Sequence, residues 1–467
     1  MEGLEAVEIR FSQLNAETRF DAEYFSKNYL KLEQQLQNLS LKTVGDFSYV
    51  TDGIHTSIDY SMESGVNLIS ATSPRQNSFD VSRQVFISEK AHDANPRTAL
   101  KVGDVIVSTV GTVGNCAVVD GSILPANSDR HVGIVRNLEG VNPYFLSTFL
   151  LGKYGNFQTL RESTGNVQLN LFLYKIRELK VPVFSAETQV KVATAVQNAL
   201  AIAQKTRLIY SEAESFLLKA LGIVDFLAPT KIANIKSFKD SFASTGRLDA
   251  EYYQPKYENL LNLLRKDGLT IADVAPVRSE KFQKTPGAYF QYLEIGGLRG
   301  DGSVAAEAVA CDEAPSRASQ RVRQGDIITS TVRPIRRLSA LVAAEQDGYV
   351  CSSGFVVLQP KQIAAEVLLV YLRLPAICEL MDLHTSASLY PAISERDLLG
   401  LPIPKIPADV QSKISELVRQ SFTLKAQSER LLNSAKRAVE IAIEVDEVAG
   451  MAYLARETEV VIEESSS

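Results

Sequence analysis

The chain has 467 residues, 45% of them hydrophobic and 22% charged, which is typical of a globular protein with two or more domains. No apolar run approaches the roughly 20 residues that span a bilayer, and the acidic, mixed segment at residues 1–10 is unlike a signal peptide. The 4 cysteines are far apart and form no C-x-x-C pair, which argues against disulfides and zinc and predicts a cytoplasmic protein.

The net charge of −6 disfavours nucleic-acid binding, but the charge is unevenly distributed along the chain. Between Arg317 and Arg337 there are 6 arginines and a single acid, Asp326, whereas residues 440–464 are strongly acidic. A local basic patch matters more to a phosphate backbone than the sum over the whole chain does. Composition therefore leaves the partner open.

The same ordered series of motifs occurs twice in the chain. The opening motif recurs after 228 residues and three later motifs recur after 222 residues, an agreement that chance does not readily supply. The pairs are RFDAEYF at Arg19 and RLDAEYY at Arg247, GDVIVSTV at Gly103 and GDIITSTV at Gly325, STGNVQLN at Ser163 and TSASLYPA at Thr385, and LKVPVFSAETQ at Leu179 and LPIPKIPADVQ at Leu401. We therefore predict two tandem copies of one domain-sized unit, which we call copy one and copy two.

Each copy is predicted to begin with a short helix, because apolar residues recur at helical spacing over residues 24–36 and again over 253–264. A strand-rich stretch follows, punctuated by Gly, Asn, Asp and Pro; its strands are DVIVSTV, CAVV and HVGIV in copy one, and DIITSTV, LSALVAA and GFVVL in copy two. A further helix is predicted at residues 143–151 and at 364–374.

A long helix is predicted to end each copy, at residues 187–221 and 408–445. Positions that alternate by 3 and 4 residues form a mostly apolar seam, as in coiled coils, although a phase slip interrupts the seam of copy one. The seam residues are Ala193, Val196, Leu200, Ala203, Ile209, Ala213, Phe216 and Ala220 in copy one, and Ile414, Leu417, Ser421, Leu424, Ser428, Leu431, Ala435, Ala438 and Ala442 in copy two.

The small seam residues favour a close approach of two helices, and the simplest partner of each helix is the helix of the other copy. A helix of about 35 residues is roughly 50 Å long. We expect an α+β fold in which two mixed α/β domains with short strands are separated by two long antiparallel coiled-coil helices with pseudo-twofold symmetry. The alternative is that each helix packs on its own domain. The expected segments are a first domain (1–185), its long helix (186–222), a linker (223–236), a second domain (237–407), its long helix (408–449) and an acidic, disordered tail (450–467).

Motifs that would indicate catalysis are missing. NPYF at Asn142 lacks the second proline of an adenine-methyltransferase loop, and a helix N-cap followed by proline explains it. GTVGN at Gly111 and GGLRGDG at Gly296 have neither a phosphate-loop nor a dinucleotide-binding context. The 4 histidines are isolated and have no metal-ligand spacing. We therefore predict a binding protein without catalytic activity, metal or cofactor.

Taken together, these motifs resemble the specificity (S) subunit of Type I restriction–modification systems. GVNLISATSPRQNSFDVSRQVFIS followed by LKVGDVIVSTVGTVGNCAVV is similar to that family's target recognition domain, with its G-D-x-[ILV]-x-S strand and G-T-x-G turn. ESTGNVQLNLFLYKIRELKVPVFSAETQ is similar to the segment that closes the domain, and copy two repeats the series. Copy two departs from the pattern with TVRPIRR in place of the G-T-x-G turn, and the chain has no Trp for the frequent P-x-x-W opening.

The resemblance implies a non-catalytic subunit in which each recognition domain binds one half of a split, asymmetric DNA target. It also implies that the long helices set the spacing between the halves and dock two DNA methyltransferase (modification) subunits, with restriction subunits as further partners. About 50 Å of helix corresponds to some 1.5 turns of duplex at about 3.4 Å per base pair. The remaining alternatives are a scaffold that binds protein partners in another phage-defence assembly and, least favoured, an enzyme.

A DNA-binding surface needs cations for phosphates and short polar side chains for base edges. In copy two the arginines flank the strand DIITSTV, which we expect to bring them together, and TSAS aligns with the STGN turn of copy one. The candidate DNA-binding residues are Arg75, Thr109, Thr112, Arg130, Ser163, Thr164 and Asn166 in copy one, and Arg317, Arg321, Arg323, Arg333, Arg336, Arg337, Ser386 and Ser388 in copy two.

Overall fold

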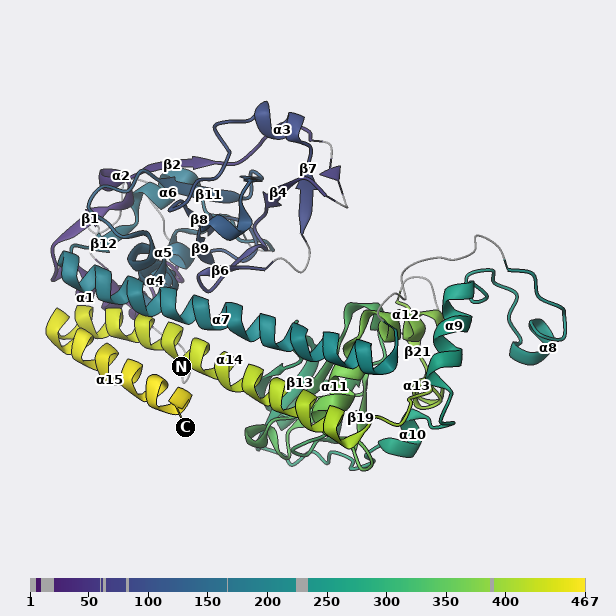
Figure 1. Cartoon of the computed structure of the whole chain (residues 1–467). Coiled ribbons are helices and arrows are strands. Elements are labelled where there is room, and N and C mark those ends of the chain that lie inside the picture. Colours follow the sequence, from purple (N-terminus) through teal and green to yellow (C-terminus); the bar gives the residue numbers. More distant parts are fainter. Residues whose placement is uncertain are drawn as a thin grey trace. The chain divides into compact units, whose positions relative to one another are not determined.

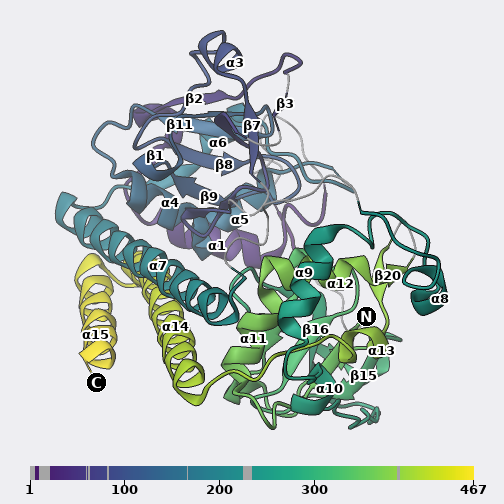
Figure 2. The same cartoon turned by 45° about the vertical axis from the view of Figure 1, so that its right-hand side comes forward.

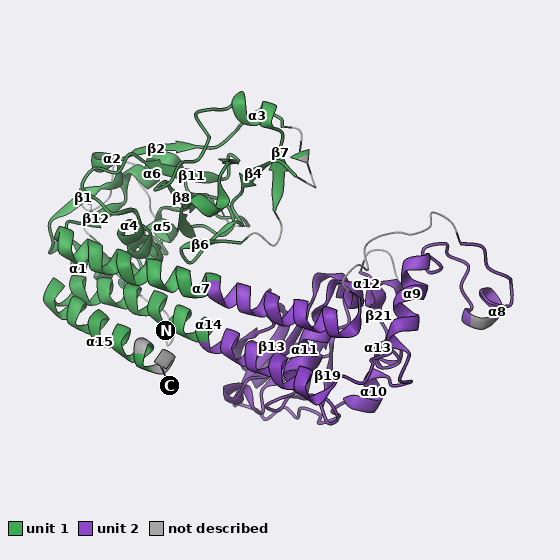
Figure 3. Ribbon diagram, in the orientation of Figure 1, with its two compact units in different colours: residues 1–204, 424–467 green, residues 205–423 purple. Residues whose placement is uncertain are grey.

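The computed structural model describes residues 6–9, 21–58, 60–61, 64–80, 84–165, 167–223, 234–386 and 390–466. The chain forms two compact units (Figure 3). Unit 1 contains residues 1–204 and 424–467, and unit 2 contains residues 205–423. The two long helices, α7 (Ala186–Leu221) and α14 (Ala408–Glu444), each contribute residues to both units. The segments expected from the sequence are consecutive stretches of the chain, and their boundaries stay a prediction. The two units are defined by contacts instead, so each unit combines residues from both copies.

Unit 1 holds the strands of copy one in two main sheets. The first sheet has the antiparallel order β2-β11-β8-β9, and Figure 2 shows these strands side by side. The second has the order β10-β4-β7-β3, in which β10 and β4 are parallel. The strands are β1 (Leu41–Thr43), β2 (Tyr49–Asp52), β3 (Tyr60–Ser61), β4 (Val66–Ile69), β5 (Pro74–Arg75), β6 (Ser78–Phe79), β7 (Val85–Ile87), β8 (Val105–Ser108), β9 (Cys116–Val118), β10 (Ala126–Ser128), β11 (Val132–Arg136) and β12 (Lys180–Pro182). The helices of copy one before α7 are α1 (Lys27–Gln37), α2 (Val44–Phe47), α3 (Glu89–Asp93), η2 (Gly121–Ile123), α4 (Pro143–Leu151), α5 (Lys153–Glu162) and α6 (Leu173–Glu178).

Unit 2 holds the strands of copy two. Its sheets have the orders β14-β13-β18-β15 and β17-β16-β19, and the pair β13 and β18 is parallel, as β4 and β10 are in copy one. The strands are β13 (Tyr289–Leu298), β14 (Val304–Ala310), β15 (Ala318–Arg321), β16 (Ile327–Ser330), β17 (Ser339–Leu341), β18 (Val350–Ser352), β19 (Phe355–Leu358), β20 (Thr385–Ser386) and β21 (Ala392–Ile393). The helices are α8 (Phe242–Thr245), α9 (Pro255–Leu264), α10 (Ile271–Val274), η3 (Cys311–Glu313), η4 (Pro334–Arg336), η5 (Ala344–Gln346), α11 (Ala365–Arg373), α12 (Pro375–Leu383) and α13 (Glu395–Leu399).

The glutamine that ends the last shared motif makes the same contacts in both copies. Gln189 accepts a hydrogen bond from the backbone N–H of Asn142 (2.8 Å) and donates one to the backbone oxygen of Phe184 (3.0 Å). In copy two, Gln411 accepts a hydrogen bond from the backbone N–H of Ala364 (2.8 Å) and donates one to the backbone oxygen of Ile406 (3.0 Å). Both partners lie 222 positions after those of Gln189. These bonds join the start of each long helix to the start of the short helix after the sheet. They confirm the internal repeat.

The G-D motif is also structural in both copies. Asp104 accepts hydrogen bonds from the backbone N–H three residues before it (2.9 Å) and from Arg136 (2.5 Å). Asp326 accepts from the equivalent N–H (2.8 Å) and from Arg278 (2.6 Å). The glycine before each aspartate has a positive φ, 89° and 83°, which the turn requires. Burial raises the pKa of Asp104.

The two long helices pack against each other, as predicted. In unit 1, Ser428 donates a hydrogen bond to the backbone oxygen of Ala199 (2.7 Å), and Val192 and Val196 of α7 share a core cluster with Ala438 of α14. Numbering rises along α7 as it falls along α14, so the helices are antiparallel there (Figure 1). The interpretation in which each helix packs only on its own domain is therefore wrong, because each helix packs on its own domain and on the other long helix. Among the seam residues, these are buried: Ala193, Val196, Ile209, Ala213, Ile414, Leu417, Ser421, Ser428, Leu431, Ala435, Ala438 and Ala442; Leu200, Ala203 and Leu424 are half-buried, Phe216 is at the margin of exposure and Ala220 is exposed.

Each domain is also anchored to the long helix of the other copy. In unit 1, Lys153 of α5 forms an ion pair with Glu444 of α14 (2.5 Å). In unit 2, Arg373 of α11 donates to the hydroxyl of Tyr210 of α7 (3.0 Å). This exchange explains why each unit contains part of both long helices. None of the helices in the described part of the chain combines the length and the hydropathy that a membrane crossing requires.

The C-terminal residues correct a prediction, because they form helix α15 (Glu447–Ser466) where we expected a disordered tail. Met451 and Leu454 are buried in the core that α7 and α14 share in unit 1, and Val461 is buried against Ala199 and Leu431. The acidic composition concealed these apolar positions, which lie on one side of a helix.

Gly450 lets α15 approach α14 closely. A Cβ atom at this position would lie 2.5 Å from the backbone oxygen of Ala438 and 3.0 Å from the Cβ of Ala442. We expect Gly450→Val to displace α15 and to destabilise unit 1 by about 1–3 kcal/mol, because the overpacked helices must separate. Faster hydrogen exchange and proteolysis in α15 would show this, with Ala452→Val on the exposed face as the control. Equal protection of α15 in both variants would contradict the prediction.

Candidate nucleic-acid interface

In each copy, two loops at the end of the central strand are joined through their backbones. In copy one, residues 109–115 follow β8 and lie beside residues 163–170, where Leu171 N–H donates to the oxygen of Thr109 (2.8 Å). In copy two, residues 331–338 follow β16 and lie beside residues 385–392, where Ile393 N–H donates to the oxygen of Thr331 (3.0 Å). We call these two loops the loop pair of each copy. Residues 166 and 387–389 lie outside the described part.

The loop pair of copy two exposes cationic and aromatic side chains. Arg333 has a positive φ of 52°, and its guanidinium lies 5.1 Å from the ring centroid of Tyr390 on the partner loop. The backbone N–H of Arg333 donates to the oxygen of Pro391 (2.8 Å), which fixes the two loops together. Arg336 is exposed, Ile335 is 48% exposed and Tyr390 is 63% exposed. This surface combines charges for phosphates with flat and apolar groups for bases.

Arg337 belongs to the same loop but has a structural role. Its guanidinium forms an ion pair with Glu214 of α7, and its backbone oxygen accepts a hydrogen bond from Arg373 (2.7 Å). A cation that is half-buried and paired with a carboxylate attaches the loop to the helix. We therefore remove Arg337 from the proposed DNA-contact residues.

The arginines before β16 form a second, separate group. The prediction that the strand brings all six arginines together is wrong, because Arg321 and Arg323 precede β16 whereas Arg333 and Arg336 follow it. A strand of four residues separates its two ends by about 13 Å. Arg317, just before β15, is exposed.

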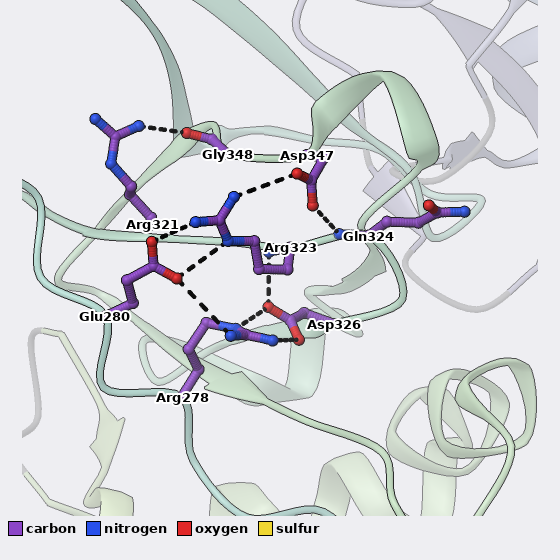
Figure 4. A network of polar contacts seen from close by, with 8 residues as sticks. All are labelled: Arg278, Glu280, Arg321, Arg323, Gln324, Asp326, Asp347 and Gly348. Carbon is purple, nitrogen blue, oxygen red and sulfur yellow. Dashed lines mark hydrogen bonds and ion pairs between the residues drawn. The ribbon is translucent and has the colours of Figure 1, made fainter.

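Arg323 is neutralised by a network of polar contacts (Figure 4). It forms ion pairs with Glu280 (2.6 Å) and Asp347 (3.3 Å), and these contacts raise the pKa of Arg323. The hydrogen bond from Arg323 lowers the pKa of Glu280, and the backbone N–H of Gln324 lowers that of Asp347. Arg278 and Asp326 continue the network (2.6 Å). The two arginines and three carboxylates of this network pair with one another, which stabilises the turn before β16.

The candidates of copy one are mostly engaged in the fold. Thr109 is buried, Thr112 donates to the backbone oxygen of Ala71 (2.8 Å), and Ser163 is buried and donates to the oxygen of Thr159 (2.6 Å). Arg75 is exposed beside Asp80 (3.6 Å), Arg130 is exposed, and Thr164 is exposed with its backbone paired to Asn170. Asn166, Ser388 and the side chain of Ser386 lie outside the described residues. Their role in DNA contact stays a prediction.

A charged cluster in copy one was missed by the sequence analysis, which treated the histidines as isolated. Asp52 pairs with His55 (2.5 Å) and with Arg97 (3.1 Å). A backbone bridge between Ile54 and Asp129 places this cluster beside the turn that holds Arg130 and His131. Asp52 and His55 are three positions apart, but Arg97 lies 45 positions after Asp52 and the turn at Arg130 lies further still, so local spacing could not reveal the whole cluster. The sequence analysis also did not identify Tyr390 as a candidate, because its contact with Arg333 depends on the pairing of two loops. Within the described residues, no group of three or more His, Cys, Asp or Glu side chains could hold a metal ion.

No family model and no curated protein matches this chain. Among solved structures, the chain is similar to the Type I restriction–modification S subunit from M. genitalium, with 13% identity over 87% of this chain and 95% of that one and a TM-score of 0.41. It is also similar to the HsdS subunit from Thermoanaerobacter tengcongensis, with 15% identity, 87% and 97% coverage and a TM-score of 0.29. A chain from a study of the assembly and conformational transition of the type I R-M system has 16% identity, 90% and 97% coverage and a TM-score of 0.28.

Proposed function

We propose that this chain is the specificity subunit of a Type I restriction–modification complex, a sequence-specific DNA-binding protein without catalytic activity of its own. The observation that carries the proposal is the loop pair. The same backbone frame occurs in both copies and presents different side chains, threonines and a glycine turn in copy one, and Arg333, Arg336 and Tyr390 in copy two. Two equivalent frames with different side chains suit a protein that recognises two different half-sites.

Each domain would bind one half of a bipartite duplex target. The long helices, of 36 and 37 residues, would set the distance between the halves and dock two methyltransferase subunits. The exchange of anchors supports this role, because each domain is held by both helices within its unit. Rigid attachment of the domains to the helices would convert helix length into a fixed spacer in the DNA.

The proposal is tested by expressing the chain with its methyltransferase partner and mapping methylated bases across a host genome. We expect a split motif of two half-sites with one fixed spacer length, and no methylation when the chain is omitted. Methylation that is independent of the chain, or that follows an unsplit motif, would contradict the proposal. A complex that assembles but never binds DNA would favour a protein-binding scaffold.

A further inference from the structure

A cleft of about 320 Å³ opens in unit 2, away from the loop pair of copy two along the chain. Its walls are the segment 282–291, the start of η3, the end of β15 and the turn at residues 347–349. Four of its lining residues are aromatic, namely Phe282, Tyr289, Phe290 and Tyr349. All of these belong to the strand-rich part of copy two, outside the loop pair.

The aromatic side chains are arranged around the opening and are not buried in the core. The ring centroids of Phe282 and Phe290 are 4.7 Å apart at an interplanar angle of 42°. Tyr289 is 77% exposed, and Phe282, Phe290 and Tyr349 are half-buried. Neighbouring aromatic rings that remain accessible to solvent are typical of surfaces that bind another flat or apolar group.

The cleft is lined by one cation and one anion. Its charged lining residues are Arg321 and Asp347. Asp347 already accepts hydrogen bonds from the backbone N–H of Gln324 (2.9 Å) and from Arg323 (3.3 Å). Arg321 lies 5.4 Å from the ring centroid of Phe282 and donates to the backbone oxygen of Gly348 (2.8 Å), a neutral acceptor (Figure 4). Asp347 is therefore paired with a cation, Arg323, whereas Arg321 donates to a neutral backbone oxygen.

We propose that this cleft binds one nucleotide whose base is not stacked in a duplex. The base would stack on Tyr289, and Arg321 would contact the phosphate. Aromatic rings bind bases by stacking whatever their sequence, and a nearby arginine attracts the backbone. Arg321, which donates to a neutral backbone oxygen, favours a ligand with a phosphate over an aromatic side chain of a protein. The nucleotide has two possible sources, an extrahelical base of DNA and a free mononucleotide. The first source rests on the proposed DNA-recognition role, and the second does not.

The test uses the full-length chain and DNA that contains the fluorescent base 2-aminopurine. The probes are a single-stranded decamer, a duplex with one bulged 2-aminopurine, the same duplex fully paired, and free dAMP as competitor. We expect quenching by the chain with the single strand and the bulge but not with the paired duplex. Tyr289→Ala should weaken this binding about tenfold, because an exposed stacking platform is lost. Arg321→Gln should also weaken binding of the probe. The difference from the wild type should be larger at low salt than at high salt, because a phosphate contact is lost.

The control is Phe238→Ala, which removes another exposed aromatic ring of unit 2 (68% exposed) and should bind as the wild type does. Displacement of the probe by dAMP would identify a mononucleotide site, and failure of dAMP to compete would identify an extrahelical base. Equal binding by the wild type and Tyr289→Ala, or no quenching with any probe, would overturn the proposal. Genome-wide methylation is a separate readout. A normal split motif together with unchanged probe binding would refute the cleft and leave the proposed function intact.

Discussion

Replacing Arg373 with Met is expected to destabilise unit 2 by about 3–5 kcal/mol, because it removes a buried cation that satisfies several buried acceptors. Arg373 is 1% exposed, yet its guanidinium donates to four acceptors. These are the hydroxyl of Tyr210 (3.0 Å), the backbone oxygens of Arg337 (2.7 Å) and Ser339 (3.1 Å), and the backbone oxygen of Gly300. Methionine fills a similar volume but leaves these buried acceptors without a donor.

The measurement is urea unfolding of the full-length chain, followed by hydrogen exchange in peptides from α11 and β17. The control is Arg396→Met, because Arg396 is exposed on α13 and its loss should leave the midpoint unchanged. Arg373→Lys should restore little, since a single ammonium cannot reach the same four acceptors. An Arg373→Met chain with the stability of the control would show that the four hydrogen bonds contribute little.

Replacing Arg333 and Arg336 together with Ala is expected to lower DNA binding by the complex with its methyltransferase by roughly tenfold or more. Arg336 is exposed, and Arg333 is half-buried beside Tyr390 of the partner loop, so the change is confined to the loop pair of copy two. Each phosphate contact that is lost should make the dependence of log affinity on log salt shallower by about one unit. Methylation of the genomic target should fall in parallel.

The matched control for this variant removes two exposed cations of the same unit outside the loop pair, Arg396→Ala with Lys405→Ala. It has the same change in net charge, so a general electrostatic effect would weaken both variants equally. Arg337→Gln should behave differently, with reduced stability of unit 2, because its ion pair with Glu214 attaches the loop to α7. A double variant that methylates its target normally would exclude the loop pair of copy two as the DNA contact.

The repeat in the sequence correctly predicted the internal duplication, although it did not reveal what the motif residues do. Gln189 and Gln411 were visible as matched positions, and so were Asp104 and Asp326. Their roles depend on backbone groups up to 47 residues away, which only the folded chain brings within hydrogen-bonding distance. The shared motifs therefore report the common scaffold, and the differences between the copies lie in the loop pairs.

The opening motif illustrates the same distinction. Arg19 lies outside the described residues, whereas Arg247 of copy two forms an ion pair with Asp249 (2.6 Å) and donates to the backbone oxygen of Leu383 (2.6 Å). This holds the segment before α9 against the end of α12. The motif is thus an attachment of the entry segment, and a sequence comparison alone could not distinguish that role from an active-site pair.

Periodicity and repetition along the chain were sufficient to predict the duplication and the two long packed helices, because helix formation and seam burial depend on residues three to four positions apart. They failed for the arginines and for the C-terminal segment. The density of arginines predicted one basic patch. In the structure, Arg323 pairs with Glu280 and Asp347. Arg337 pairs with Glu214, and all three carboxylates come from other segments of the chain. Which cations remain exposed for DNA depends on contacts between segments far apart in sequence, and folding alone establishes these contacts.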